Sequence, residues 1–265
     1  TYLGALQAFT PYEPTYIEIE TDEEGITLES FKQQTINSKP RIVYLNPTFQ
    51  NPTGKTLSLK RRMELGKLIK KLNVLVIEDN PYGDLQYSGE PVEPLWKFAP
   101  DNVIHVSTFS KILAPGIRIG YCVAPLDITT MLVAAKQGSD LHTNSFSQAL
   151  AAEYLSGCYL EKQLPKIIAI YKPRLDAMLA SLKRHMPNNY SWTRPNGGMF
   201  VWVTGPKEMD SLKLYDRAIS AGVAFVPGFC FYAGKGEGSN TMRLNFTNVS
   251  EDKIEKGISL LASLL

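Results

Sequence analysis

The stretch Ser107-Thr-Phe-Ser-Lys111-Ile-Leu-Ala-Pro-Gly-Ile-Arg118-Ile-Gly-Tyr121 decides how this 265-residue chain is interpreted. Lys111 closely follows the apolar run Val103 to Val106, hydroxyl side chains stand beside it, and Arg118 comes seven residues later across a Pro-Gly turn. Hydroxyls and a guanidinium suit a bound phosphate, and a neighbouring amine suits a Schiff base with an aldehyde on the same ligand. Taken alone, the segment also fits a strand, a turn and a second strand with solvated Lys and Arg, because short motifs misfire often.

Two earlier segments show the same change from an apolar run to a polar loop. Asn46-Pro-Thr-Phe-Gln-Asn51-Pro-Thr-Gly54 follows the run Ile42 to Leu45, and Val74-Leu-Val-Ile-Glu-Asp79-Asn-Pro-Tyr82 contains both a run and its polar end. Open α/β sheets bind ligands at the carboxyl ends of their strands. We therefore expect one ligand to be contacted by the side chains of Asn51, Asp79, Tyr82 and Lys111.

In this order, the motifs resemble those of the pyridoxal-phosphate-dependent aminotransferases of fold type I, class I/II, in particular the kynurenine and 2-aminoadipate aminotransferase branch. The same domain forms the effector half of GntR/MocR-type bacterial transcription regulators. The resemblance covers essentially all 265 residues. It implies a three-layer α/β/α fold, with a mostly parallel sheet in a large cofactor-binding domain and a smaller C-terminal α/β domain.

The resemblance assigns catalytic roles to three residues. Lys111 is expected to be the Schiff-base lysine and to move the proton between the substrate Cα and the cofactor. Asp79 is expected to pair with the pyridine nitrogen and make the ring an electron sink. Tyr82 and Asn51 are expected to hydrogen-bond the 3′-oxygen, with Asn51 also facing the substrate. Without the resemblance, Asp79 is a strand-end carboxylate, Asn51 a turn residue before proline, and Tyr82 a half-buried aromatic residue.

The remaining cofactor and substrate contacts also come from the resemblance. Thr108, Ser110 and Arg118 would hold the 5′-phosphate, and Tyr2 would stack on the cofactor ring, although a tyrosine near a chain end is usually a packing residue. Arg243, in Thr241-Met-Arg243-Leu-Asn-Phe246, would bind the substrate α-carboxylate, a bidentate task that lysine performs poorly. By position alone it could be a solvated edge-strand arginine.

A glycine pair and a basic helix each allow two interpretations. The loop Asn196-Gly197-Gly198 resembles the one that enters the substrate site, although two glycines equally suit a plain tight turn. The stretch Lys60-Arg61-Arg62, with three further lysines in the next ten residues, is locally basic. Because it lies in an amphipathic helical pattern, we expect a solvated face rather than a binding patch.

Composition is typical of a globular enzyme. Hydrophobic residues make up 44% of the chain, and 28 Lys plus Arg against 26 Asp plus Glu give a net charge of +2, so neither nucleic acid nor an anionic membrane is expected as a partner. The widely spaced Cys122, Cys158 and Cys230 show no metal-type pairing, which favours a reducing cytoplasm. No apolar run approaches the roughly 20 residues of a membrane span. No metal site is expected.

Strand and helix patterns alternate along the chain, which predicts a mostly parallel sheet covered on both faces. Domain boundaries are expected at 1–155 for the large domain, incomplete at its N-terminus, 156–186 for a connecting helical region interrupted near Pro165 and Pro173, and 187–265 for the small domain. Strands are expected at 16–19, 42–45, 74–77, 103–106, 117–123, 199–203 and 242–246. Helices are expected at 28–34, 59–72, 128–136, 212–221 and 252–264.

The resemblance also implies that the sequence is the C-terminal two-thirds of a longer protein, and we expect weak or absent turnover from it alone. The predicted function is transamination between an amino acid and a 2-oxo acid, in a parent protein that forms a homodimer. The alternatives are an effector domain that senses an amine or pyridoxal phosphate in a transcription regulator, and a lyase or decarboxylase on the same scaffold.

Overall fold

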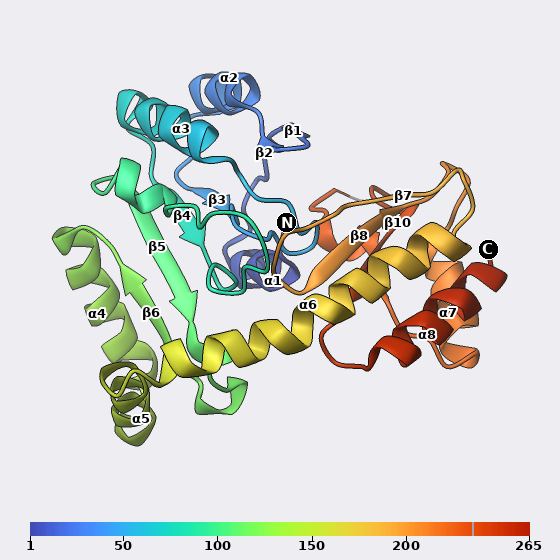
Figure 1. Cartoon of the computed structure of the whole chain (residues 1–265). Helices are drawn as coiled ribbons and strands as arrows, with labels where there is room; N and C mark the ends of the chain where they lie inside the picture. Colours follow the sequence, from blue (N-terminus) through green and yellow to red (C-terminus); the bar gives the residue numbers. More distant parts are fainter. Residues whose placement is uncertain (235) are drawn as a thin grey trace.

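Two four-stranded sheets organise the computed structural model, which describes residues 1–234 and 236–265. The first has the order β3-β4-β5-β6, in which β3, β4 and β5 are parallel and β6 runs antiparallel to β5 (Figure 1). Its strands are β3 (Val43–Leu45), β4 (Val76–Asp79), β5 (Val103–Thr108) and β6 (Gly120–Val123). The sheet is therefore mixed, and the predicted α/β class is confirmed.

Helix α3 (Leu59–Leu72) connects β3 to β4 and covers part of this sheet. Ser58 caps its start by accepting a hydrogen bond from the Arg61 backbone N–H at 3.3 Å. Leu65 and Ile69, spaced four residues apart on one helix face, are fully buried in a cluster with Val76 and Val103 from the strands. Helical periodicity and a capping serine explain why the predicted helix 59–72 agrees with the observed one.

The second sheet has the order β7-β8-β10-β9 and is antiparallel throughout. Its strands are β7 (Ser191–Trp192), β8 (Phe200–Thr204), β9 (Val226–Pro227) and β10 (Thr241–Asn245). The helices of this region are α7 (Ser211–Ser220) and α8 (Glu251–Ser263). A buried cluster from β8, β10 and the adjoining helices forms its core, including Val201, Met242 and Ile258.

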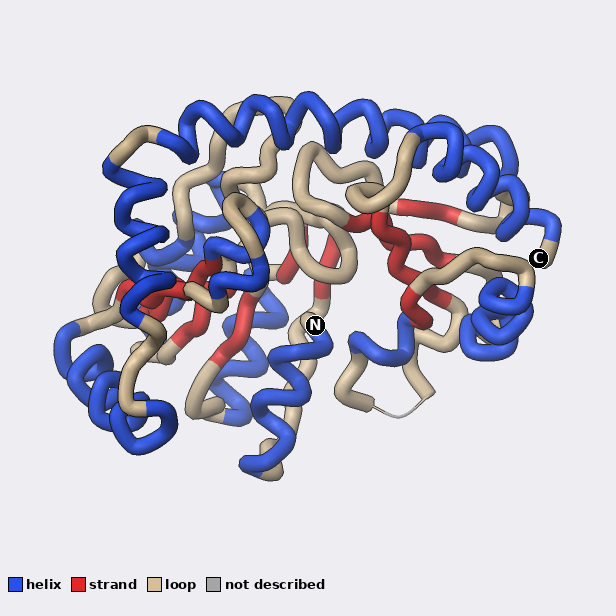
Figure 2. Tube along the Cα trace, turned by 90° about the horizontal axis from the view of Figure 1, so that it is seen from below, coloured by secondary structure: helices blue, strands red, loops and turns tan. Residues whose placement is uncertain are grey.

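The long helix α6 (Tyr159–His185) joins the two sheet regions and runs along both of them in Figures 1 and 2. It continues through Pro165 and Pro173, so the interruptions expected at these prolines were wrong. Both prolines are exposed, whereas Leu175 and Leu182 are buried in the second core. Packing therefore outweighs the lost backbone hydrogen bonds. Helical conformation is interrupted instead between α5 and α6, at Cys158, which has a left-handed φ of 54°.

The strand expected at residues 16–19 was also wrong, because the structure places a loop there and a short hairpin immediately after it. The Glu20 backbone bonds to Ser30 Oγ and to the Thr27 N–H instead of to a neighbouring strand. The hairpin and the remaining regular elements are α1 (Leu3–Phe9), β1 (Thr21–Asp22), β2 (Gly25–Ile26), α2 (Leu28–Ser38), α4 (Leu126–Asp140) and α5 (Ser145–Ser156). The short 3-10 turns are η1 (Thr10–Tyr12), η2 (Leu95–Phe98), η3 (Phe109–Lys111), η4 (Pro115–Ile117) and η5 (Gly228–Phe231).

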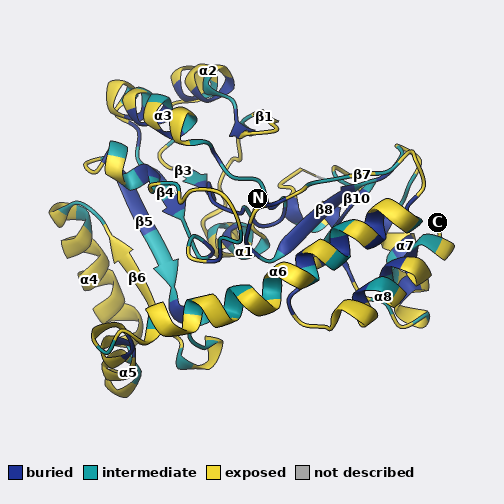
Figure 3. Cartoon of the chain, in the orientation of Figure 1, coloured by how far each residue is buried: buried dark blue, intermediate teal, exposed yellow. Residues whose placement is uncertain are grey.

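Burial is uneven across the molecule. Strands β8 and β10 are mostly buried, whereas all of β6 and nearly all of α4 are exposed (Figure 3). Large apolar side chains on this exposed side include Leu126, Met131 and Phe146. No helix within residues 1–234 and 236–265 is long and apolar enough to cross a membrane.

Candidate active site

The predicted site residues leave the first sheet at the carboxyl ends of its parallel strands. Asp79 is the last residue of β4, and Thr108 is the last residue of β5. The two strand ends are joined, since Ser107 Oγ donates to the Asn80 carbonyl at 2.8 Å. Lys111 ends the 3-10 turn η3 that directly follows β5, and Asn51 lies in the loop after β3. These positions therefore lie at or shortly after the carboxyl ends of β3, β4 and β5, where open α/β sheets bind ligands.

A continuous chain of hydrogen bonds connects Arg243 of the second sheet to Asp79 of the first. Arg243 Nη1 donates to Asn51 Oδ1 at 2.7 Å, although the two residues are 192 positions apart. The Asn51 backbone N–H donates to Asn46 Oδ1 at 2.8 Å, and Asn46 Nδ2 donates to the Asp79 carbonyl at 2.6 Å. Groups expected to contact substrate and cofactor are thus fixed relative to one another by direct bonds.

Tyr82 adjoins this chain and presents a protonated hydroxyl. Asn51 Nδ2 donates to Tyr82 Oη at 3.4 Å, and the Tyr82 ring packs edge-on against Phe200 with 5.8 Å between centroids. Burial raises the pKa of Tyr82 to about 12, against smaller lowering effects of the Asn51 hydrogen bond and the Arg243 charge. The phenol therefore remains a hydrogen-bond donor at neutral pH.

Arg243 lies on β10 between two aromatic rings. Its guanidinium carbon is 4.1 Å from the Phe200 centroid and 5.0 Å from the Phe231 centroid. Its Nε is buried and has no hydrogen-bond partner among the residues that the structure describes, and burial lowers the pKa of the guanidinium below its ordinary value. A half-buried cation with an unsatisfied donor favours an anionic ligand, and a carboxylate can accept two parallel N–H bonds from it. The alternative of a solvated edge-strand arginine is excluded.

Asp79 is held on one oxygen only. Tyr44 Oη donates a hydrogen bond to Asp79 Oδ2, while Oδ1 has no partner among the described residues and is not enclosed. Burial raises the pKa of the Asp79 carboxyl above its ordinary value, although the Tyr44 hydrogen bond and the nearby His105 both act to lower it. Oδ1 can therefore accept a hydrogen bond from a protonated nitrogen of a ligand.

Within residues 1–234 and 236–265, the residues expected to bind phosphate form side-chain hydrogen bonds to each other and to nearby backbone. Thr108 Oγ1 lies 2.9 Å from Ser110 Oγ and accepts from the Ser110 backbone N–H at 3.1 Å. Arg118 is exposed, and its only side-chain hydrogen bond among the described residues goes to the Pro115 carbonyl at 3.2 Å. Its backbone φ of 55° is uncommon for a residue with a Cβ, and such conformations cluster at functional sites.

Tyr2 lies at the border of this site and is 39% exposed. Burial is the main cause of the raised pKa of both Tyr44 and Tyr82, and Tyr2 adds a smaller electrostatic contribution to each, so it is close to both residues. The Tyr2 ring folds back over Gly4, where a Cβ would stand 2.6 Å from the phenol oxygen. This placement is compatible with the expected stacking position.

The glycine pair Gly197-Gly198 serves the contact between the two regions. A Cβ on Gly197 would lie 2.3 Å from the Leu85 carbonyl and 2.4 Å from the Phe49 ring, and Gly198 has a φ of +73°. The Gly198 N–H donates to the Leu85 carbonyl at 2.8 Å. These glycines therefore allow close docking of β8 on the loop after β4.

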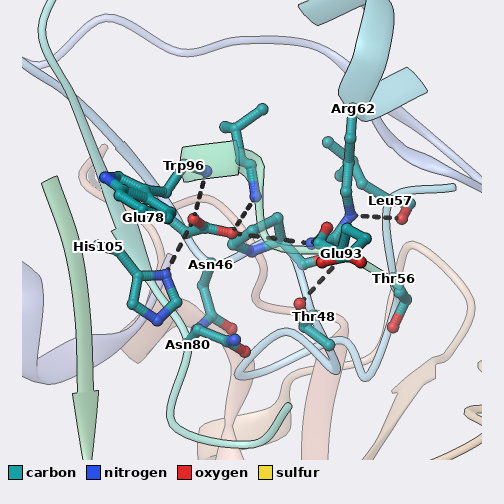
Figure 4. A network of polar contacts seen from close by, with 12 residues as sticks. Asn46, Thr48, Thr56, Leu57, Arg62, Glu78, Asn80, Glu93, Trp96 and His105 are labelled. Carbon is teal, nitrogen blue, oxygen red and sulfur yellow. Dashed lines mark hydrogen bonds and ion pairs between the residues drawn. The ribbon is translucent and has the colours of Figure 1, made fainter. Parts of the chain in front are cut away.

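Arg62 corrects the prediction that the basic helix is a wholly solvated face. Its guanidinium is fully buried and bonds the Pro47 carbonyl at 2.9 Å, the Leu57 carbonyl at 3.0 Å and Thr48 Oγ1 at 2.9 Å (Figure 4). It also lies 3.7 Å from Glu78. Burial lowers the pKa of Arg62 to about 10. Arg62 thus braces the loop that carries Asn51.

Glu78, which directly precedes Asp79 on β4, completes this network. Its two oxygens accept from the Leu95 and Trp96 backbone N–H groups at 2.7 and 2.9 Å, and one lies 3.0 Å from His105 Nδ1 (Figure 4). Sequence reasoning missed this network, together with Tyr44 and Asn46. The sequence did contain a signal for Arg62, because it shares a helix face with the apolar residues three and seven positions later.

The chain is similar in sequence and structure to proteins of one known family. The model of the family "Aminotransferase class I and II" matches residues 11–261. Aromatic-amino-acid aminotransferase 1 of Thermococcus litoralis is 48% identical over the whole chain, which covers 65% of that relative. The structure of Pyrococcus horikoshii kynurenine aminotransferase, in complex with PMP and kynurenine, superposes with a TM-score of 0.94 at 49% identity, with 100% of this chain and 67% of that one covered. The chain thus spans about two thirds of the length of these proteins.

A regulator is also similar. The HTH-type transcriptional regulator YisV of Bacillus subtilis is 31% identical over 99% of this chain and 54% of its own length. The predicted resemblance to the kynurenine and 2-aminoadipate branch and to such regulators is confirmed.

Proposed function

Because this chain belongs to the class I and II aminotransferases, we propose that it binds pyridoxal phosphate and transfers the amino group of an amino acid to a 2-oxo acid. One observation carries the proposal: the hydrogen-bonded chain from Arg243 through Asn51 and Asn46 to Asp79. It links a half-buried cation suited to a carboxylate with a carboxylate suited to a protonated ring nitrogen.

The residues present fit the cofactor. Asp79 Oδ1 is free for the pyridine nitrogen, Tyr82 Oη is a donor for the 3′-oxygen, and the hydroxyls of Thr108 and Ser110 stand beside Lys111. Arg118 would add charge to the phosphate, and Tyr2 would cover the ring. When bound, pyridoxal phosphate supplies an aldehyde for amines and a ring that withdraws electrons.

The roles of the protein's own groups follow from these positions. Arg243 holds the α-carboxylate of the amino acid through its free guanidinium donors, and Asn51 fixes the orientation of that guanidinium. With the cofactor bound, the Lys111 amine would accept the proton from the substrate Cα and later release it. Asp79 would pair with the ring nitrogen and favour its protonated form, and Tyr82 would donate a hydrogen bond to the 3′-oxygen.

The substrate class we propose is an aromatic amino acid with a 2-oxo acid as acceptor. The Thermococcus and Pyrococcus relatives support this choice by their names, and Phe200 and Phe231 supply apolar surface around Arg243. We also propose the three-layer arrangement, the division at 1–155, 156–186 and 187–265, and a homodimer. Exposed apolar residues on α4 and α5, such as Met131 and Phe146, support a contact between subunits.

The test is borohydride reduction of the protein with pyridoxal phosphate, followed by mass mapping of the labelled peptide. We expect one label, on Lys111, and its absence in Lys111→Ala. The exposed Lys172→Ala on α6 serves as the control and should label normally. Replacing a general base lowers rates by about 10²- to 10⁴-fold, so Lys111→Ala should also lose turnover of an aromatic amino acid to this extent. Wild-type protein that remains unlabelled would contradict the proposal.

A further inference from the structure

Tyr44 is a half-buried side chain that the proposed mechanism does not yet use. It lies at the middle of β3, between Val43 and Leu45, and pairs in register with Ile77 of the neighbouring strand β4. Its ring packs edge-on against Phe9 of α1, with 6.1 Å between centroids and 76° between planes. Two elements therefore fix the direction of its hydroxyl.

The Tyr44 hydroxyl has one partner among the described residues, Asp79 Oδ2. Burial and the Asp79 charge both raise the pKa of Tyr44 above its ordinary value, so the phenol stays protonated and can only donate to the carboxylate. The Asp79 backbone carbonyl is separately held by Asn46. Backbone and one carboxylate oxygen are thus both restrained, while Oδ1 has no partner in residues 1–234 and 236–265.

We propose that Tyr44 is a positioning residue: its hydroxyl holds one oxygen of Asp79 so that the other is aimed at the pyridine nitrogen. This inference rests on the proposed function, because it assumes that Asp79 meets the cofactor ring. A carboxylate free to rotate would lose part of its interaction with the ring nitrogen, and catalytic groups act best when held in place in advance.

Other ionisable groups around Asp79 act in different ways. His105 on β5 lowers the pKa of the carboxyl through its charge, and its Nδ1 is already bound to Glu78. Tyr82, in the loop after β4, is close enough for the Asp79 charge to raise its own pKa. Among these groups only Tyr44 bonds the carboxylate directly, so removal of a single oxygen atom isolates its effect.

Tyr44→Phe is the decisive variant because it keeps the ring against Phe9 and removes only the hydroxyl. The matched control is Tyr215→Phe, since Tyr215 on α7 forms the same edge-on pair with Phe225, at 5.6 Å, away from any site carboxylate. The first measurement is a ¹³C carboxyl titration of cofactor-free protein, with Asp79→Asn identifying the resonance. We expect the Asp79 titration to move to higher pH in Tyr44→Phe and to stay unchanged in Tyr215→Phe.

The second measurement is turnover of the cofactor-loaded protein with an aromatic amino acid. A lost hydrogen bond to a charged group should lower kcat about tenfold with little change in KM, and should shift the pH profile of the bound cofactor's absorbance. If wild-type protein labels at Lys111 but Tyr44→Phe matches it in titration and kcat, the positioning role is wrong and the function stands. If wild-type protein takes up no label, the proposed function and the positioning role of Tyr44 are both contradicted.

Discussion

The two ends of the proposed cofactor site differ in how firmly the protein holds them. At the ring end, Asp79, Asn51 and Arg243 are joined by hydrogen bonds that cross from one sheet to the other. At the phosphate end, Thr108 and Ser110 bond mainly to each other, and Arg118 is exposed. The ring end is therefore tied into the fold by long-range hydrogen bonds, whereas the phosphate end is a short local turn after β5.

Removal of the buried Arg62 should have the largest effect, because its guanidinium supports the ring end. Arg62→Ala would leave Glu78 buried without its cation and release the loop that carries Asn51. Breaking a buried ion pair from one side costs about 3–5 kcal/mol of unfolding free energy. The neighbouring Arg61→Ala, which removes a surface pair with Asp22, should cost at most about 1 kcal/mol. Urea unfolding would measure both, and equal losses would contradict a special role for Arg62.

The phosphate end should behave in the opposite way. Arg118→Ala should weaken binding of pyridoxal phosphate about 10- to 100-fold, because it removes a charged hydrogen bond to the phosphate. Since Arg118 is exposed, the unfolding free energy of the cofactor-free protein should change by no more than about 0.5 kcal/mol. Cofactor titration and urea unfolding of the same samples would separate the two effects. A large loss of stability would show that this end is also part of the core.

The same difference explains what could be predicted from the sequence. The change from apolar run to polar loop is local, so the positions of Asp79 and Lys111 at the strand ends followed from it. The partners of Asp79 did not, because Tyr44 is 35 residues away and an ordinary strand tyrosine in its own segment. The buried Arg62 depends in the same way on Glu78, which is contributed by another strand.

Helix α6 shows a second limit of local patterns. Its prolines predicted interruptions, but a proline breaks a helix only where the cost of its missing hydrogen bond exceeds the gain from packing. Both prolines face solvent, and the core contacts of Leu175 and Leu182 lie on the other side. The catalytic and binding roles of the site residues were predicted from the family resemblance, not from local patterns of this kind.

A smaller change in stability is expected from Asp79, because ionisation of its carboxyl in the folded protein costs free energy. Burial raises the pKa of its carboxyl, so ionisation of Asp79 is harder in the folded than in the unfolded protein. Below the unfolded pKa, roughly 3.9, both states are protonated and no cost exists; the cost develops as the pH rises through the folded pKa and persists above it.

Asp79→Asn should therefore raise the thermal midpoint of the cofactor-free protein by a few degrees at pH 7, and this gain should shrink as the pH is lowered toward 4. The exposed Asp101→Asn is the control and should show no such gain. A midpoint that falls at pH 7 in Asp79→Asn would mean that the bonds to Tyr44 and the field of His105 outweigh burial, and that the ring end stabilises the fold as well as the ligand.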